Sequence, residues 1–174
     1  NCTCNLGYTG PDGLECTACV AGTYKHMNGS SLCLLCLQGT YSMETGEKSE
    51  ATCTTCPNHT YSGSGSSINT NCTCNLGYTG PDGQNCTACI AGTYKDVNGT
   101  ASCHVCPADK YSAETGEMSN STCTDCPSHT WSFEGSPHLN NCTCNKGYTG
   151  LDVNTCTACV AGTYKPGNGS AECT

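Results

Sequence analysis

Large apolar side chains are scarce in this chain, and they follow no regular spacing. Leu, Val and Ile are scattered, and the sequence contains a single Trp, Trp131, and a single Phe, Phe133. No window keeps the 3.6-residue period of an amphipathic helix or the two-residue period of a half-buried strand for long enough to build a packed face. We therefore expect almost no helix and no conventional hydrophobic core.

Cysteine, glycine and aromatic residues recur at fixed offsets instead. An aromatic residue follows the second cysteine of a Cys-x-x-Cys border by five positions, as in Cys19-Val-Ala-Gly-Thr-Tyr24, and the same offset places Tyr41 and Tyr61. Glycine suits a tight turn, and an aromatic ring is the largest apolar surface that so small a unit offers. We interpret these aromatic residues as structural. The pattern predicts short two-stranded β-ribbons joined by turns.

A longer period contains these small units. The segment Asn1-Cys-Thr-Cys-Asn-Leu-Gly-Tyr-Thr-Gly returns from Asn71, and again from Asn141 with Lys146 in place of Leu6. Four cysteine-bounded units fill each period of 70 residues. A fixed period without insertions is typical of an elongated array in which each unit contacts mainly its neighbours. We predict repeats at residues 1–70, 71–140 and 141–174, and we expect both ends of the chain to be truncated.

Composition indicates what stabilises such an array. Cysteine occupies 21 of 174 positions, as in small disulfide-rich scaffolds. Ordering the chain costs about 1.5 kcal/mol per residue, and a disulfide that closes a loop of about 15 residues stabilises the fold by roughly 3 kcal/mol. The predicted fold class is therefore small and disulfide-rich, an elongated tandem array of short β-ribbon and turn units.

Charge and hydropathy argue against two classes of partner, nucleic acids and the membrane interior. The formal net charge is −8 and the pI is about 4.8, the wrong sign for binding a phosphate backbone. No stretch has the roughly 20 apolar residues of a membrane span, and no segment resembles a signal peptide. We expect no nucleic-acid partner and no membrane span in this chain.

The border and turn pattern resembles a known family. Cys-x-x-Gly-Thr-Tyr next to Cys-x-x-Cys resembles the ephrin-receptor-like cysteine-rich repeat and, more distantly, the modules of tumour-necrosis-factor receptors. The resemblance covers three units in four. The fourth unit, Cys4-Asn-Leu-Gly-Tyr-Thr-Gly-Pro-Asp-Gly-Leu-Glu-Cys16, resembles the closing loop of an EGF-like domain and lacks the rest of that domain, so it is an EGF-like half.

The resemblance implies a disulfide pairing in which each unit closes on itself. The implied bonds are Cys4–Cys16, Cys19–Cys33, Cys36–Cys53, Cys56–Cys72, Cys74–Cys86, Cys89–Cys103, Cys106–Cys123, Cys126–Cys142, Cys144–Cys156 and Cys159–Cys173. Cys2 is left over, and we expect its partner upstream of residue 1. A crossed scheme, Cys16 with Cys33 and Cys19 with Cys36, stays open because spacing alone does not fix connectivity.

Two other chemistries use the same cysteine spacing. Cys16-x2-Cys19-x13-Cys33-x2-Cys36 satisfies a four-cysteine zinc pattern, but zinc sites would leave the Cys-x-Cys pairs in awkward positions. A redox Cys-x-x-Cys needs a thioredoxin-like strand and helix around it, and none is visible. We predict that these cysteines form disulfides rather than zinc or redox sites, because the glycosylation signals described below indicate an oxidising compartment.

No residue pattern indicates catalysis or a cofactor. Five histidines lack metal-ligand or triad spacing, so we interpret them as surface residues: His26, His59, His104, His129 and His138. Calcium binding by acidic side chains is an option, but the sequence lacks the cluster of acidic and Asn ligands that would support it. The acidic residues considered are Asp12, Glu44, Glu47, Glu114 and Glu117. We expect no enzyme activity and no cofactor.

Asn-x-Ser/Thr sequons are dense. They occur at Asn1, Asn28, Asn58, Asn71, Asn85, Asn98, Asn120, Asn141 and Asn168. Each one predicts a surface loop that can carry an N-glycan. The sequons in Asn-Gly-Ser/Thr turns, at Asn28, Asn98 and Asn168, are the strongest, whereas those with a central Cys are weaker because the disulfide competes with the transferase.

Regular repetition favours a structural role. We expect a segment of a glycoprotein that self-associates into an extracellular filament, a sheath, or a flagellar or cell-surface hair. The alternative is the stalk or binding region of an adhesion or signalling receptor, which the family resemblance allows. Fold resemblance does not by itself choose between these two functions.

Overall fold

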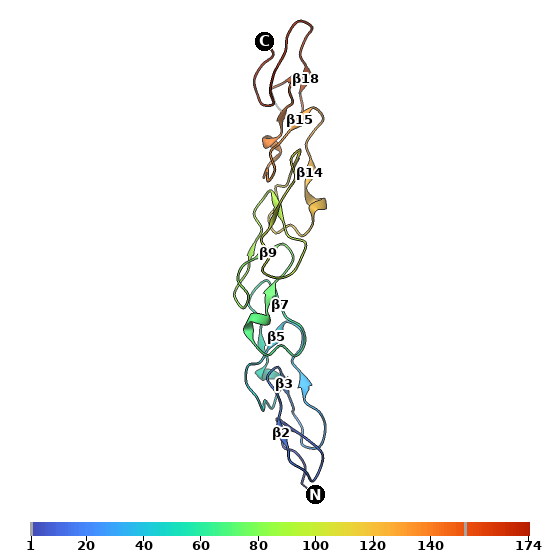
Figure 1. Ribbon diagram of the computed structural model, residues 1–174, viewed down its shortest axis with the longest axis vertical. Helices are drawn as coiled ribbons and strands as arrows, with labels where there is room; N and C mark the ends of the chain where they lie inside the picture. Colours follow the sequence, from blue (N-terminus) through green and yellow to red (C-terminus); the bar gives the residue numbers. More distant parts are fainter. Residues whose placement is uncertain (1, 152) are drawn as a thin grey trace. The chain divides into compact units, whose positions relative to one another are not determined.

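The computed structural model describes residues 2–151 and 153–174, and those residues form a series of short two-stranded ribbons (Figure 1). They contain no α-helix. All eighteen strands are two residues long, and they pair into nine ribbons. This confirms the predicted fold class.

The strands take their places from the cysteine and aromatic pattern. They are β1 (Tyr8–Thr9), β2 (Thr17–Ala18), β3 (Thr23–Tyr24), β4 (Leu34–Leu35), β5 (Thr40–Tyr41), β6 (Thr54–Thr55), β7 (Thr60–Tyr61), β8 (Thr73–Cys74), β9 (Tyr78–Thr79), β10 (Thr87–Ala88), β11 (Thr93–Tyr94), β12 (His104–Val105), β13 (Lys110–Tyr111), β14 (Thr124–Asp125), β15 (Thr130–Trp131), β16 (Thr143–Cys144), β17 (Tyr148–Thr149) and β18 (Thr157–Ala158). Threonine and tyrosine dominate these positions, as β propensity favours.

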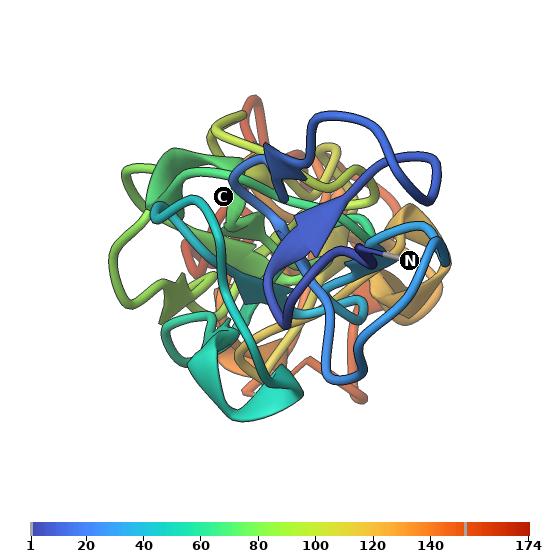
Figure 2. The same ribbon diagram turned by 90° about the horizontal axis from the view of Figure 1, so that it is seen from below.

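Each ribbon joins the start of one cysteine-bounded unit to the border that ends it. The second strand is the dipeptide inside a Cys-x-x-Cys border, or Thr73–Cys74 and Thr143–Cys144 at the two Cys-x-Cys borders. In the ribbon of β3 and β4, for example, Thr23 is opposite Leu35 and Tyr24 is opposite Leu34. Between strands, four 3₁₀ turns fill the longer loops: η1 (Glu50–Thr52), η2 (Asn69–Asn71), η3 (Asn120–Thr122) and η4 (Leu139–Asn141). Figure 2 shows how small the strands are beside the loops.

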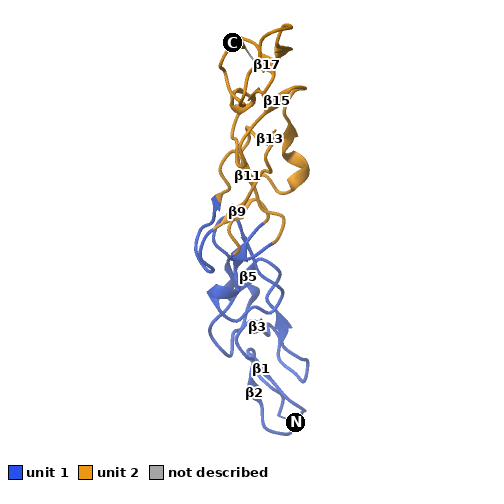
Figure 3. Ribbon diagram, turned by 45° about the horizontal axis from the view of Figure 1, so that its top comes forward, with its two compact units in different colours: residues 1–75, 80–87, 98–100 blue, residues 76–79, 88–97, 101–174 orange. Residues whose placement is uncertain are grey.

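Contact clustering divides the chain into two compact units (Figure 3). Unit 1 comprises residues 1–75, 80–87 and 98–100, and unit 2 comprises residues 76–79, 88–97 and 101–174. The predicted boundaries at residues 70 and 140 follow the sequence period, and they stay a prediction.

The core consists of disulfides. Among the described residues, the buried apolar set is Tyr24 together with eleven cysteines, several of which are 0–1 % exposed. Large aliphatic side chains such as Leu32, Leu34 and Leu35 are exposed instead. The expectation of a fold without a conventional hydrophobic core is therefore confirmed, and covalent cross-links take the place of packed side chains.

Candidate functional site

The structure contains ten disulfides, and they join the same cysteine pairs that the family resemblance implied. Sequence separations of 12, 14, 17 and 16 residues occur in that order and then begin again. Cys16 is bonded to Cys4 and Cys36 to Cys53, so the crossed scheme and a four-cysteine zinc site are both absent from this structure. Cys2 is exposed and forms no disulfide with another described residue.

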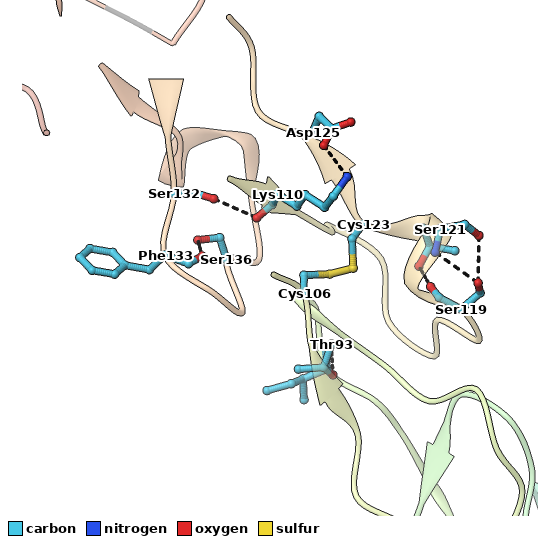
Figure 4. Close-up of a disulfide and its surroundings, with 12 residues drawn as sticks. Thr93, Cys106, Lys110, Ser119, Ser121, Cys123, Asp125, Ser132, Phe133 and Ser136 are labelled. Atoms are coloured by element: carbon cyan, nitrogen blue, oxygen red, sulfur yellow. Dashed lines mark hydrogen bonds and ion pairs between the residues drawn. A yellow bond between two sulfur atoms is a disulfide. The ribbon is translucent and has the colours of Figure 1, made fainter. Parts of the chain in front are cut away.

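We call the stretch that each disulfide closes a module. Figure 4 shows the module closed by Cys106–Cys123 and the border residue Asp125 that follows it; the Lys110 ammonium forms an ion pair with Asp125 across the ribbon of β13 and β14. The Ser132 hydroxyl, from the following module, donates to the Lys110 carbonyl at 2.9 Å. A side chain of one module thus bonds to the backbone of the module before it.

Successive modules are joined at one position, the third residue after the first cysteine of each module. We call it the joint residue. At Gly22 the backbone N–H donates to the Ser42 carbonyl at 2.8 Å, and the Gly22 carbonyl accepts from the Cys36 N–H at 2.9 Å. The same two bonds recur at Gly7, Gly39, Gly77, Gly92, Asp109 and Gly147. One residue therefore hydrogen-bonds twice to the next module.

The joint residue has a positive φ in every module. This holds for Gly7, Gly22, Gly39, His59, Gly77, Gly92, Asp109, His129, Gly147 and Gly162. Glycine is needed for a second reason at some of them, since a Cβ on Gly22 would lie 2.2 Å from the Gly65 carbonyl oxygen. A Cβ on Gly39 would meet nothing within 4 Å, and its counterpart in the next repeat is Asp109. The structure thus explains why the sequence departs from glycine at some joints.

Three buried lysines form a feature that the sequence patterns did not reveal. Lys25, Lys95 and Lys165 are 1 %, 0 % and 4 % exposed. The Lys25 Nζ donates to the carbonyl of Tyr8 at 2.7 Å and to that of Gly29. Burying an ammonium is costly unless it is hydrogen-bonded, and these two carbonyls accept from two of its three donors.

The other two lysines repeat the arrangement. Lys95 Nζ donates to the Tyr78 carbonyl at 2.7 Å, and Lys165 Nζ donates to the carbonyls of Cys144, Tyr148 and Gly169. The signal was present in the sequence, because three of only six basic residues stand 70 positions apart. An isolated lysine normally indicates a solvated surface, which is why the pattern was not interpreted as burial.

The sequons divide into two structural groups. The asparagines of eight sequons are exposed, while Asn1 lies outside the described residues. Asn28, Asn98 and Asn168 lie in bends, and the hydroxyl residue two positions later is also exposed in each case, at Ser30, Thr100 and Ser170. These three sites present both parts of the acceptor at the surface.

The remaining sequons are held more tightly. Asn71 and Asn141 each end a 3₁₀ turn and precede a fully buried disulfide cysteine. Asn120 begins η3, where the Thr122 hydroxyl donates to the Ser119 carbonyl at 2.6 Å. The Asn85 side-chain oxygen accepts from the Asn58 backbone N–H at 3.0 Å, and the Thr60 hydroxyl of the Asn58 sequon donates to the Pro57 carbonyl.

The titratable side chains of residues 2–151 and 153–174 do not converge on a site. All five histidines are exposed, and His129 stacks on Tyr148 with ring centroids 4.2 Å apart. Of the acidic residues considered for calcium, Asp12, Glu44 and Glu114 are exposed, and Glu47 and Glu117 are half-buried. The described residues contain no group of three or more His, Cys, Asp or Glu that could hold a metal ion. None of their helices is long and apolar enough to cross a bilayer.

Curated relatives resemble parts of this chain. It is 32% identical over 125 residues to Cysteine repeat modular protein A of Toxoplasma gondii, an alignment that covers 68% of this chain and 4% of the relative. It is 29% identical over 89 residues to Sushi, von Willebrand factor type A, EGF and pentraxin domain-containing protein 1 of Rattus norvegicus, covering 51% and 2% respectively. The chain thus spans a small fraction of the length of either relative. The similarity to these relatives and the dense disulfides together indicate that this chain is located outside the cell or at the cell surface.

A family match covers more than half of the chain. The tyrosine-protein kinase ephrin type A/B receptor-like family matches residues 7–51 and 77–123. Each match begins at a joint glycine, Gly7 or Gly77, inside the EGF-like half, covers the next module completely, and ends near the cysteine that closes the module after it, at residue 51 or at Cys123. The disulfides and joints of these modules are the structural basis of the pattern. This chain belongs to the ephrin type A/B receptor-like family of cysteine-rich repeats.

Proposed function

We propose that this chain is a segment of a structural glycoprotein that self-associates into an extracellular filament, sheath, or flagellar or cell-surface hair. In this proposal it has no enzyme activity and needs no cofactor. N-glycans on the exposed sequons cover the surface of the assembly.

One observation carries the proposal, which is the constancy of the joints between modules. Disulfide separations of 12, 14, 17 and 16 residues return without change, and joint residues such as Gly7 and Gly77 make the same two hydrogen bonds. A polymer needs identical units that present the same surface in each repeat. A binding module instead tends to vary the segment that meets its ligand.

The alternative is the stalk or binding region of an adhesion or signalling receptor. The family match favours it, because the family is named for ephrin receptors. In that case the repeated modules act as a spacer, and the asparagine-linked sugars protect it.

Electron microscopy of the natively secreted protein separates the two. Continuous fibres with an axial repeat that matches the 70-residue unit, and that become thinner after enzymatic removal of N-glycans, support the structural assembly. Single unassembled chains attached to membranes contradict it and favour the receptor stalk.

A further inference from the structure

The turn that carries the Asn28 sequon contains a chemically reactive dipeptide, Asn28–Gly29. Because glycine has no side chain to shield its nitrogen, the backbone nitrogen of Gly29 can attack the side-chain carbon Cγ of Asn28. The new N–Cγ bond closes a succinimide ring, and the side-chain nitrogen leaves as ammonia with the proton of the Gly29 N–H. Water then opens the ring at either carbonyl and gives aspartate or isoaspartate. Asn28 is exposed and lies in a bend, so water has access to it.

The Gly29 nitrogen is not free to attack in the folded chain. Its N–H donates to the Cys4 carbonyl at 2.8 Å, and the Gly29 carbonyl accepts from the buried Lys25 ammonium. Cys4 is 1 % exposed and is bonded to Cys16, so the disulfide holds the acceptor in place. Attack on Asn28 would take the Gly29 N–H away from a carbonyl in the interior of the module, which is costly. The closed module therefore opposes the reaction.

The same protection occurs at a second kind of turn. Asp-Gly dipeptides form the same ring, with water as the leaving group. In Asp12–Gly13 the glycine N–H donates to the Cys2 carbonyl at 2.8 Å. In Asp82–Gly83 it donates to the Cys72 carbonyl at 2.9 Å. These turns differ from the Asn28 turn in sequence and in their place within the repeat, so the hydrogen bond in one does not follow from the other.

The two remaining Asn-Gly dipeptides are also held by a cysteine carbonyl. The Gly99 N–H donates to the Cys74 carbonyl at 2.8 Å, and the Gly169 N–H donates to the Cys144 carbonyl at 2.9 Å. No further Asn-Gly or Asp-Gly occurs in the sequence. The nucleophilic nitrogen is thus engaged at each dipeptide of the chain that could form a succinimide readily.

We propose that Asn28 is a latent deamidation site that the closed module protects. When a thiol reductant opens the Cys4–Cys16 bond, the Gly29 nitrogen is freed and Asn28 is converted to aspartate or isoaspartate. The conversion removes the sequon and adds a negative charge, and isoaspartate also lengthens the main chain within the turn that Lys25 holds. The modification is irreversible, so it records that the module has been open. The inference is independent of the proposed self-association.

The test uses the secreted chain with the substitutions S30A/T100A/S170A, which keep the Asn-Gly dipeptides but prevent N-glycosylation of them. Peptide mass spectrometry follows the conversion of Asn28 to aspartate and isoaspartate during incubation at mildly alkaline pH. We expect Asn28 to convert at least about fivefold faster in the reduced and alkylated chain than in the disulfide-bonded chain, because one hydrogen bond of ordinary strength no longer has to break.

Opening one module alone separates local protection from general unfolding. In the same background, C4S/C16S should speed the conversion of Asn28 and leave that of Asn168 unchanged. The Asn168 turn is held in another module, where Lys165 bonds the Gly169 carbonyl, and it serves as the control within the same molecule. The Asn168 side-chain oxygen also accepts from the Lys146 N–H at 2.9 Å.

A second variant keeps every disulfide. K25M removes the ammonium that holds the Gly29 carbonyl, and it should also speed the conversion of Asn28. The matched control K48M changes an exposed lysine and should leave the rate unchanged. Equal rates in K25M and K48M would show that Lys25 has no part in the protection.

Three outcomes overturn the inference. If Asn28 converts equally fast in the disulfide-bonded and the reduced chain, the fold does not protect it. If Asn28 stays unconverted in the reduced and alkylated chain, the dipeptide is not reactive. If C4S/C16S speeds conversion at Asn28 and Asn168 alike, the effect is general unfolding, and protection by the individual module is wrong. None of these results bears on whether the chain self-associates.

Discussion

Lys25 illustrates how a single residue can tie a small module together when few apolar side chains are available. Its ammonium group bonds the carbonyl of Tyr8 from one module and that of Gly29 from its own. Gly29 is also the central residue of the Asn28 sequon, and its N–H donates to the Cys4 carbonyl at 2.8 Å. The lysine therefore fixes the turn that presents the glycosylation signal.

Replacing Lys25 with Met should destabilise the chain. The substitution keeps the aliphatic stem and removes the donors, so the part-buried carbonyls of Tyr8 and Gly29 each lose one hydrogen bond. We expect a loss of about 1–3 kcal/mol in the free energy of unfolding. Denaturant titration with intact disulfides measures it. The matched variant Lys48→Met, at an exposed lysine, should change stability little. If Lys25→Met and Lys48→Met destabilise the chain equally, the hydrogen bonds of Lys25 do not stabilise the fold.

The joint glycines differ in what they tolerate. Gly22 and Gly39 have nearly the same φ, +81° and +76°, but only Gly22 has a carbonyl oxygen in the path of a Cβ. Left-handed backbone costs an L-residue about 1–2 kcal/mol. Gly39→Ala should cost that amount, and Gly22→Ala should cost clearly more because the Gly65 backbone has to move.

Hydrogen exchange of individual amides checks the difference between the two glycines. In Gly22→Ala we expect faster exchange at the Cys36 and Gly65 amides, which bond to the Gly22 and Cys36 carbonyls. In Gly39→Ala the Cys56 amide should keep most of its protection. If both variants expose their joints equally, steric contact with Gly65 is not what requires glycine at residue 22.

The module, as an element, is defined by its disulfide and its ribbon. Ten disulfides follow one another along the chain, and each joins cysteines 12 to 17 residues apart. A two-stranded ribbon this short would be only marginally stable in water without its cross-link. The ribbons were predictable because Thr-Tyr pairs and borders recur at fixed offsets. Their exact register was not, since two-residue strands carry no alternation from which to derive it.

Peptide mapping of the secreted chain under non-reducing conditions tests the pairing. Cleavage between modules should release peptides that contain Cys19 with Cys33 and Cys36 with Cys53, and no peptide that joins Cys19 to Cys36. Reduction with alkylation is the control, because it must separate every pair. Recovery of Cys16 with Cys33 would establish the crossed scheme and contradict the structure.

At the scale of the whole molecule, repetition sets both stability and surface. Each module is hydrogen-bonded to the next one through its joint residue. A destabilising change in one module should therefore affect mainly the module next to it. The chain is acidic, with a formal net charge of −8, and each exposed sequon is a position at which an N-glycan can be attached. The described part of the chain relies on its cross-links and its repeats more than on a central core.

Glycopeptide mass spectrometry should find a graded occupancy of the sequons. We expect Asn28, Asn98 and Asn168 to be glycosylated and Asn71 and Asn141 to be largely unmodified, because the disulfide through the central cysteine restricts the acceptor. The variant C56S/C72S keeps an Asn-Ser-Thr sequon and removes the bond, so occupancy of Asn71 should rise. Full occupancy of Asn71 in the unmodified chain would contradict this explanation.

The repeat, the cysteine-bounded units and the lack of a conventional core among the described residues could all be predicted from the sequence. These follow from spacing and composition, which act locally and are visible along the chain. The fold was needed to show that Lys25 is buried, and that a Cβ at residue 22, unlike one at residue 39, would meet a carbonyl oxygen. Each of those properties depends on a carbonyl or a neighbouring module supplied from elsewhere in the chain, and residue type alone does not record which partners the fold brings within reach.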